Sequence, residues 1–173
     1  MGEPDDKVVN QVTWKIPNGL FLIGTRSGDR WNGMTASWVT QVSMKPVLIA
    51  AAIENKALTK QLIDESGRFS VNLWPADDTR VFVKFSTPAE KEDMTLNGRA
   101  VREGSTGVPI FEEAVAWMEL EVRQAHDLGT HTLYVGELVD AGFNGDFEEG
   151  KQKEVAWLGK TRMKYGGVAR PAH

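Results

Sequence analysis

Hydroxyl-bearing and small side chains gather in one segment of this sequence, between Gly33 and Gln41. Its central residues are Thr35, Ala36, Ser37, Trp38, Val39 and Thr40. Hydroxyl groups both donate and accept hydrogen bonds, and small residues let a ligand approach the backbone closely. The pattern therefore suits the polar edge of a flat ring. The alternative is an edge strand with solvated hydroxyls and one packed Trp, and composition alone favours it.

A second candidate site lies where a buried strand is expected to end and a helix to begin, at Asn55, Lys56 and Thr59. Backbone N–H groups at a helix N-terminus have no helical partners, and the helix dipole favours an anion there. Together with the Lys56 ammonium and the Thr59 hydroxyl, these groups could hold a phosphate. The simpler and commoner alternative is an Asn cap beside a solvent-exposed Lys.

The chain contains only three histidines, and His131 is the one expected to open a strand, directly after Leu128-Gly129-Thr130. It could contact a bound nucleotide, or it could be a half-buried strand residue bonded to a neighbouring carbonyl. Phe85 and Ser86 are expected to be a core residue and a helix end. A Ser/His/Asp site is not indicated, because no nucleophile-elbow motif is present.

The amino-acid composition limits the kinds of binding partner and catalytic site that this chain can have. The 173 residues fit a single domain, 1–173, and 41% hydrophobic and 25% charged residues are ordinary for a globular protein. The net charge of -4 and the scattered basic residues argue against a nucleic-acid partner. The absence of cysteine excludes disulfides, thiolate catalysis and Cys-ligated metal centres, and we expect no metal site. Any redox chemistry must therefore come from a bound organic cofactor.

We expect a soluble cytoplasmic protein without a membrane partner. No apolar run reaches the ~18 residues of a membrane span. The first ten residues, MGEPDDKVVN, are acidic and polar, unlike a signal or transit peptide. No Gly-rich phosphate loop is present either, so a nucleotide would have to bind by other means.

The elements that must position these residues are mostly strands. Alternating or apolar runs predict them over Val12–Ile16, Leu20–Thr25, Trp31–Met44, Val47–Ile53, Phe69–Leu73, Ala116–Val122 and His131–Val139. Two short helices are predicted, over residues 55–63 with Gly67 as the stop, and over 77–85 with Val81 and Phe85 on one side.

Between Ser86 and Glu113 the chain is polar and rich in turn residues, and we expect an irregular lid there rather than a disordered segment. In the strand 116–122, Met118, Leu120 and Val122 are expected to face one way, and Trp117, Glu119 and Glu121 the other. Because strands and helices do not alternate, a parallel sheet is not indicated. The fold class is mainly β, an antiparallel barrel with two short helices.

The order of these segments resembles a known family. The runs G-M-T-A-S-W-V-T-Q-V-S, K-P-V-L-I-A-A-A-I, N-K-A-L-T-K-Q-L-I and G-R-F-S-V-N-L-W resemble the first half of the flavin reductase-like family of FMN-binding split barrels. Downstream, A-V-A-W-M-E-L-E-V, G-T-H-T-L-Y-V-G-E-L-V-D-A-G and the closing K-Y-G-G resemble its second half. The resemblance extends from about Gly19 to Gly167.

The resemblance implies a homodimeric flavoprotein in which NADH or NADPH transfers a hydride to N5 of FMN, with FAD as the other flavin. It implies that residues 35–40 line the ring and ribityl chain. Asn55, Lys56 and Thr59 would hold the phosphate, with Phe85 and Ser86 nearby. His131 matches the family's histidine beside the open face of the flavin. Reduced flavin would leave for a partner oxygenase or pass electrons on while bound.

One departure from the family pattern bears on the electron donor. Many members that use NADH have Gly-Asp-His where this chain has Gly129-Thr130-His131. The Thr form is similar to flavoprotein domains associated with rubredoxin and diiron flavoproteins. The alternative function is therefore a non-catalytic FMN electron carrier that docks a redox partner protein, and a sensory domain with an empty cleft is a third. The sequence leaves open the choice between NADH and NADPH, and the identity of the electron acceptor.

Overall fold

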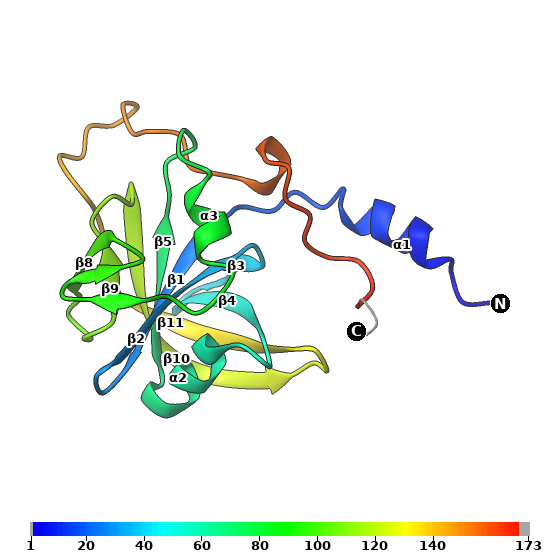
Figure 1. The fold of residues 1–173 in the computed structure, drawn as a ribbon, viewed down its shortest axis with the longest axis horizontal. Coiled ribbons are helices and arrows are strands. Elements are labelled where there is room, and N and C mark those ends of the chain that lie inside the picture. Colours follow the sequence, from blue (N-terminus) through cyan, green and yellow to red (C-terminus); the bar gives the residue numbers. More distant parts are fainter. Residues whose placement is uncertain (1, 170–173) are drawn as a thin grey trace.

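The computed structural model describes residues 2–169. In chain order its elements are α1 (Asp6–Thr13), β1 (Phe21–Ser27), β2 (Arg30–Ala36), β3 (Val39–Met44), β4 (Val47–Glu54), α2 (Leu58–Ser66), β5 (Arg68–Leu73), α3 (Val81–Lys84), β6 (Lys91–Glu92), β7 (Thr95–Leu96), β8 (Arg99–Glu103), β9 (Pro109–Phe111), β10 (Ala116–Asp127), β11 (His131–Phe143) and a 3₁₀ turn, η1 (Leu158–Lys160). The fold is mainly β, as the sequence predicts (Figure 1).

The larger of two sheets within residues 2–169 is antiparallel, with strand order β2-β1-β5-β10-β11-β4-β3. Its two edge strands, β2 and β3, are consecutive in the chain and separated only by Ser37 and Trp38. Three Cα–Cα steps of about 3.8 Å each join them, so the two edges must converge at this point. The sheet is therefore rolled into a barrel that is split between β2 and β3. The segment Trp31–Met44, predicted as a single strand, forms two strands.

Two groups of buried side chains form the core. One fills the inside of the rolled sheet and contains Ile23, Phe69 and Tyr134. The other, around Phe85 and Phe111, lies among β1, β2, α3 and the smaller sheet. The Phe85 and Phe111 rings meet edge to face, with centroids 5.4 Å apart. Phe85 is thus a core residue that fixes the end of α3 against β2.

Helix α2 packs Leu62 and Ile63 into the core and ends at Gly67, whose φ of 68° lies in the left-handed region that glycine adopts without strain. Its N-cap residue is Ala57, and its first turn has no side-chain cap among residues 2–169. The prediction that Asn55 caps this helix is therefore wrong. The Asn55 side chain bonds a distant hairpin instead, as described below.

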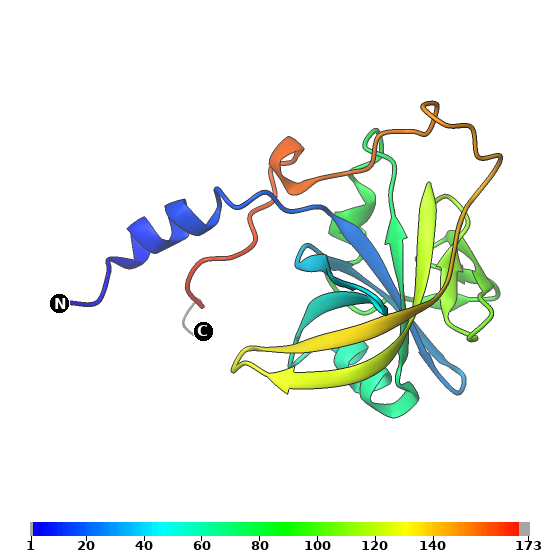
Figure 2. The same cartoon turned by 180° about the vertical axis from the view of Figure 1, so that it is seen from behind.

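The predicted strand Val12–Ile16 is also wrong, because Val12 belongs to α1. The Asp5 carboxylate accepts hydrogen bonds from the backbone N–H groups of Lys7 (2.8 Å) and Val8 (3.3 Å) and so caps this helix. Helix α1 projects from the barrel beside the C-terminal segment (Figures 1 and 2). No helix in the described residues is long and apolar enough to span a bilayer.

The segment Ser86–Glu113 is folded rather than irregular. It contains β6 to β9, which form a small antiparallel sheet against β1, β2 and β5. Beyond Ser86, this segment does not line the cavity of about 660 Å³ described below, so it is not a lid over that cavity. These strands have two to five residues each, too short for a periodicity to show in the sequence.

Glu119 of β10 anchors this small sheet. It is fully buried, and its carboxylate accepts hydrogen bonds from the backbone N–H and the hydroxyl of both Ser105 and Thr106. The four bonds satisfy a buried charge that would otherwise be costly. The loop at 105–106 supplies these donors, which the pattern of β10 alone does not indicate.

Candidate functional site

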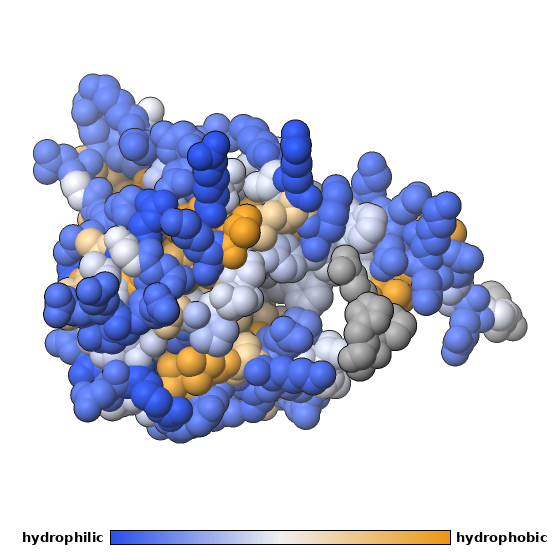
Figure 3. Space-filling model, in the orientation of Figure 1, coloured by the Kyte–Doolittle hydropathy of each residue, from blue (hydrophilic) through white to orange (hydrophobic). Residues whose placement is uncertain are grey.

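A cavity of about 660 Å³ lies where the two edges of the rolled sheet converge. Residues from β2, from the β2–β3 connection, from the ends of β4 and β11, and from the C-terminal segment line it. They are Met34, Thr35, Ala36, Ser37, Trp38, Ala52, Glu54, Asn55, Lys56, Ser86, Gly129, Thr130, His131, Tyr165, Gly166, Gly167, Val168 and Ala169. In the space-filling view the molecule is hollowed between the barrel and the projecting arm (Figure 3).

Thr35 and Ser86 form one wall of the cavity, and the end of α3 holds both in place. The Thr35 hydroxyl donates to the Phe82 carbonyl (2.7 Å), and so does the Ser86 hydroxyl (3.1 Å). The Thr35 backbone N–H donates to the Phe85 carbonyl (2.9 Å). Both hydroxyl oxygens keep lone pairs that can accept a hydrogen bond from a ligand. Phe85 itself is fully buried and acts only through its carbonyl.

The β2–β3 connection supplies the next part of the wall. Ser37 is 6% exposed and lines the cavity. The Trp38 carbonyl accepts from the Ala52 N–H (3.0 Å), which ties the connection to β4. A hydroxyl on a cavity wall is a natural ligand contact, because it can both donate and accept a hydrogen bond. Val39 and Thr40 lie past the turn and do not line the cavity.

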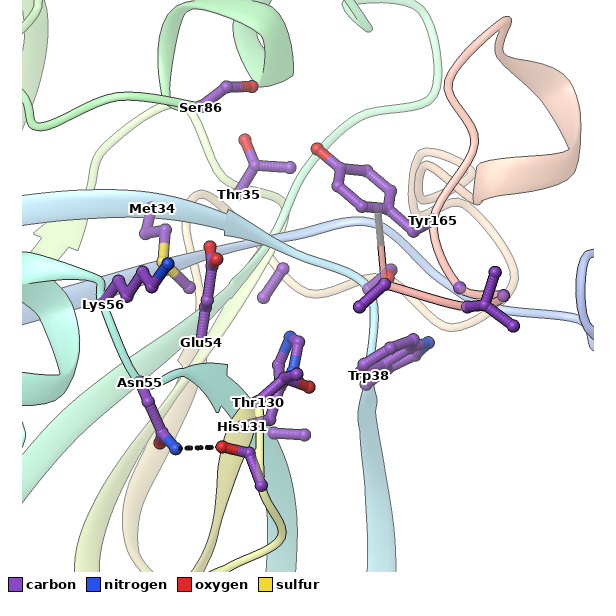
Figure 4. A pocket seen from close by; sticks show the side chains of 18 residues that line it. Met34, Thr35, Trp38, Glu54, Asn55, Lys56, Ser86, Thr130, His131 and Tyr165 are labelled. Carbon is purple, nitrogen blue, oxygen red and sulfur yellow. Dashed lines mark hydrogen bonds between the residues drawn. The ribbon is translucent and has the colours of Figure 1, made fainter. Parts of the chain in front are cut away.

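Asn55 joins the end of β4 to the hairpin between β10 and β11. Its amide nitrogen donates to the Gly129 carbonyl (2.8 Å) and to Asp127 (3.2 Å), and its amide oxygen accepts from the Thr132 hydroxyl (2.6 Å). The bond to Gly129 is drawn in Figure 4. Bonds from the Gly129 N–H and from Asn55 hold the pKa of Asp127 below its ordinary value, against weak desolvation. The side chain of Asn55 is therefore committed to this hairpin.

The start of α2 borders the cavity through Lys56, whose side chain is exposed. Because Ala57 provides no side-chain cap, the first N–H groups of the helix need other acceptors. Thr59 is fully buried, away from the cavity, and its hydroxyl accepts from the Asn32 amide (3.0 Å). Asn55 and Lys56 line this end of the cavity, so an anion there would meet Lys56 rather than Thr59.

His131 opens β11 beside Glu54 of β4, and the two side chains lie on the cavity wall. Its ring packs against that of Trp38 at a tilt of 53°, with centroids 4.9 Å apart. The ring nitrogen Nδ1 lies 2.8 Å from the Thr130 hydroxyl. Burial lowers the pKa of His131 from 6.5, and the Glu54 carboxylate opposes that shift only in part. The imidazole is therefore mainly neutral at pH 7.

Tyr165 and the residues after it form a wall that the sequence did not assign to the site. In Figure 4 Tyr165 lies on the same side as Thr35 and Ser86, across from Thr130 and His131. Burial raises the pKa of the Tyr165 hydroxyl, so it remains protonated. The K-Y-G-G run indicated a similarity to known proteins but carried no sign of where the chain would place it.

Eight of the twelve predicted site residues thus share one cavity. They are Thr35, Ala36, Ser37, Trp38, Asn55, Lys56, Ser86 and His131. Residues the prediction missed include Met34, Glu54, Thr130 and Tyr165. Over the described part of the chain, no group of three or more His, Cys, Asp or Glu side chains is placed to hold a metal ion.

Comparison with known proteins bears on this arrangement. Residues 13–163 match the model of the flavin reductase like domain. The chain belongs to this family. Among its relatives is the ferric-chelate reductase (NAD(P)H) of Archaeoglobus fulgidus, 36% identical over 140 residues that cover 80% of this chain and 83% of that protein.

Solved structures agree with the flavin reductase-like fold. The FMN-binding protein of Thermus thermophilus, solved with bound 1-cyclohex-2-enone, superposes with a TM-score of 0.75 at 26% identity and covers 100% of this chain and 96% of its own. BorF, the flavin reductase component of a bacterial two-component tryptophan halogenase, has a TM-score of 0.72 at 27% identity, covering 82% and 89%. The predicted split barrel is confirmed.

Proposed function

We propose that this protein is an NAD(P)H-dependent flavin reductase that binds FMN, or FAD, in the cavity lined by Thr35, Lys56 and His131. The observation that carries the proposal is the convergence of hydroxyl groups, a cationic helix start and a neutral imidazole on one cavity. Its relative from A. fulgidus is named as an NAD(P)H-dependent reductase. The family and the site therefore point to the same class of reaction.

The residues present fit a flavin. A cavity of about 660 Å³ lies within the usual range for cofactor sites, roughly 300–1,000 Å³. The Ser37 hydroxyl lies on the cavity wall, and the oxygens of Thr35 and Ser86 can still accept. Such groups suit the polar edge of an isoalloxazine ring. The uncapped start of α2 beside Lys56 suits the phosphate.

When bound, the flavin would supply the redox chemistry by accepting a hydride from a reduced nicotinamide at N5. The chain contributes binding and orientation. The Trp38 ring packs against the His131 ring, and Nδ1 lies 2.8 Å from the Thr130 hydroxyl. In the tautomer in which that hydroxyl donates to Nδ1, Nε2 carries the N–H of the imidazole. A neutral donor at this position can orient a nicotinamide amide without placing a second positive charge beside Lys56.

The test uses the purified protein incubated with FMN, passed through gel filtration and titrated without oxygen with NADH and with NADPH. We expect a retained flavin absorbance band that bleaches on addition of one or both donors. His131→Gln should slow bleaching by on the order of ten- to a hundredfold through misplacement of the nicotinamide. His126→Gln is the matched control, because His126 is exposed on β10 and does not line the cavity.

Other results of this bleaching test would point to a different function. A retained band that neither NADH nor NADPH bleaches would contradict a reductase and favour the non-catalytic electron carrier. If the protein retains no flavin absorbance band and also shows no turnover with free flavin, the proposal of flavin chemistry is contradicted. Ferric complexes belong among the acceptors tested, because the A. fulgidus relative is named a ferric-chelate reductase. A partner oxygenase is a second acceptor, by analogy with the two-component halogenase.

We further propose a homodimer formed through β3 and the distal half of β11. Val42 and Met44 on the edge strand β3, and Val139 and Phe143 on β11, are exposed apolar side chains. Apolar residues along a sheet edge favour pairing with a second chain. Light scattering after gel filtration should give twice the chain mass, and Met44→Lys combined with Phe143→Lys should give the monomer.

A further inference from the structure

A smaller cavity of about 110 Å³ adjoins the flavin site at Tyr165, which lines both. Two indole side chains, Trp14 and Trp157, line this smaller cavity, together with Lys15 and Lys164. We call it the Trp14–Trp157 cleft. It joins residues that precede β1 to residues around η1, so neither side of it belongs to the rolled sheet itself.

The side chains of Trp14 and Trp157 are not part of the buried core, so core packing does not explain why these positions are aromatic. Ala156 and Leu158 point inward and are buried, whereas Trp157 between them is 40% exposed. Trp14 is 39% exposed. A side chain at Gly159 would collide with the Trp157 ring, so the absence of a Cβ there lets the ring lie flat against the backbone. Large aromatic side chains left partly in water stabilise the fold less than buried ones and are typical of ligand sites.

Positive charge accompanies the indoles, although the whole chain carries a net charge of -4. The Lys164 ammonium lies 5.9 Å from the Trp14 ring centroid, and that of Lys160 lies 5.9 Å from the Trp157 ring. Lys160 is paired with Glu154 (2.6 Å). The cationic residues Lys15 and Lys164 on the cavity wall have exposed side chains. The cleft therefore combines flat aromatic surface with two lysines, Lys15 and Lys164, that form no salt bridge within residues 2–169.

The cleft is also fixed to the flavin site. The Trp14 indole N–H donates to the Gly166 carbonyl (3.2 Å), and Gly166 lines the larger cavity. The Val168 N–H donates to the Asn10 side chain (2.9 Å), which holds the C-terminal segment against α1. Tyr165 stands between the two cavities, so a ligand that reaches both must pass this side chain.

Building on the proposed function, we propose that the Trp14–Trp157 cleft binds the adenosine-phosphate end of a dinucleotide whose other end lies in the flavin site. The indoles would stack on the purine, since every base offers a flat π-face to an aromatic side chain. Lys164 and Lys15 would bind the phosphate. NADPH, NADH and FAD share this adenosine-phosphate chemistry, whereas FMN lacks it.

The first experiment measures binding of adenosine 2′,5′-bisphosphate, 5′-AMP and FMN to the full chain by fluorescence or calorimetric titration. Trp157→Ala should weaken binding of the two adenosine nucleotides by about tenfold or more, because base stacking on one aromatic ring is lost. Its affinity for FMN should not change. Trp157→Phe keeps an aromatic ring and should keep most of the affinity. Phe147→Ala removes an exposed aromatic ring that lines neither cavity and should change nothing.

The steady-state experiment then distinguishes the sources of the adenosine. A rise in the KM for NADPH larger than for NADH in Lys164→Ala would support a 2′-phosphate at Lys164. Weaker FAD binding in Trp157→Ala with unchanged KM values would support the cleft as an FAD subsite. Absence of adenosine-nucleotide binding to the wild type, or an equal loss of FMN affinity in Trp157→Ala, would overturn the proposal. Failure of the wild type to bind FMN would overturn the proposed function instead, while the adenosine titration still tests the cleft.

Discussion

Replacement of Asn55 by Ala separates two roles for this residue that the site allows. As a phosphate ligand, Asn55 would affect flavin affinity and leave stability alone. In the structure its side chain instead bonds Gly129, Asp127 and Thr132 across the end of β4. We therefore expect Asn55→Ala to destabilise the fold and to loosen the hairpin that carries His131.

The size of the effect follows from those bonds. Asn55→Ala removes one bond to a carbonyl and one to a carboxylate, and leaves the nearly buried Thr132 hydroxyl without its acceptor. Net contributions of about 1 kcal/mol per bond, reduced for partial exposure, give a loss of roughly 2–3 kcal/mol in the free energy of unfolding. For a chain of this size that corresponds to a fall of roughly 4–12 °C in Tm.

Urea unfolding of the protein without flavin measures this loss directly, and flavin titration of the same sample measures affinity. Lys56→Ala is the matched variant, because Lys56 is the next residue on the same wall and is exposed. It should change the free energy of unfolding by less than about 0.5 kcal/mol and weaken FMN binding. If Asn55→Ala unfolds like the wild type and loses FMN affinity as Lys56→Ala does, the hairpin role is refuted.

Three further predictions concern buried or half-buried polar groups. Glu119→Ala strands four donors from the loop 105–106 and should cost roughly 3 kcal/mol in urea unfolding; a loss below 1 kcal/mol would show that the loop does not depend on it. The folded-state pKa of His131 lies below 6.5, so the unfolded chain binds its proton first and stability should fall as pH drops below 6.5. His131→Gln should reduce that slope, and an unchanged slope would assign it to other groups. Tyr134→Phe removes the bond to Asp64 (2.5 Å) and should cost about 1–2 kcal/mol, measured by thermal unfolding against the wild type.

The sequence predicted the parts of the site that depend on short stretches of chain. The hydroxyl-bearing run at 35–38 and the strand start at His131 are local patterns, and the structure brings both to one cavity. Val39 and Thr40 fall outside this cavity, because the chain turns between β2 and β3 without a Gly or Pro to mark the place.

Contacts between distant residues account for the other failures. Asn55 looked like a cap because Asn caps helices often, but its partners lie more than 70 residues further along the chain. Tyr165 lies beyond the last strand, and only the path of the C-terminal segment brings it to the cavity. The resemblance to a family supplied the fold that local patterns could not, because it encodes the long-range strand order.

The strand order also bears on when the site can form during folding. β1, β2 and β5 pair locally, and so do β3 and β4, but β10 and β11 stand between these two groups and come later in the chain. The halves of the sheet therefore remain unconnected until the last hairpin arrives, a closure whose loop entropy makes it slow. During synthesis, the ribosome must release most of the chain before His131 meets Trp38. A flavin can stabilise the finished protein, yet it has no complete site to bind while the first two thirds of the chain collapse.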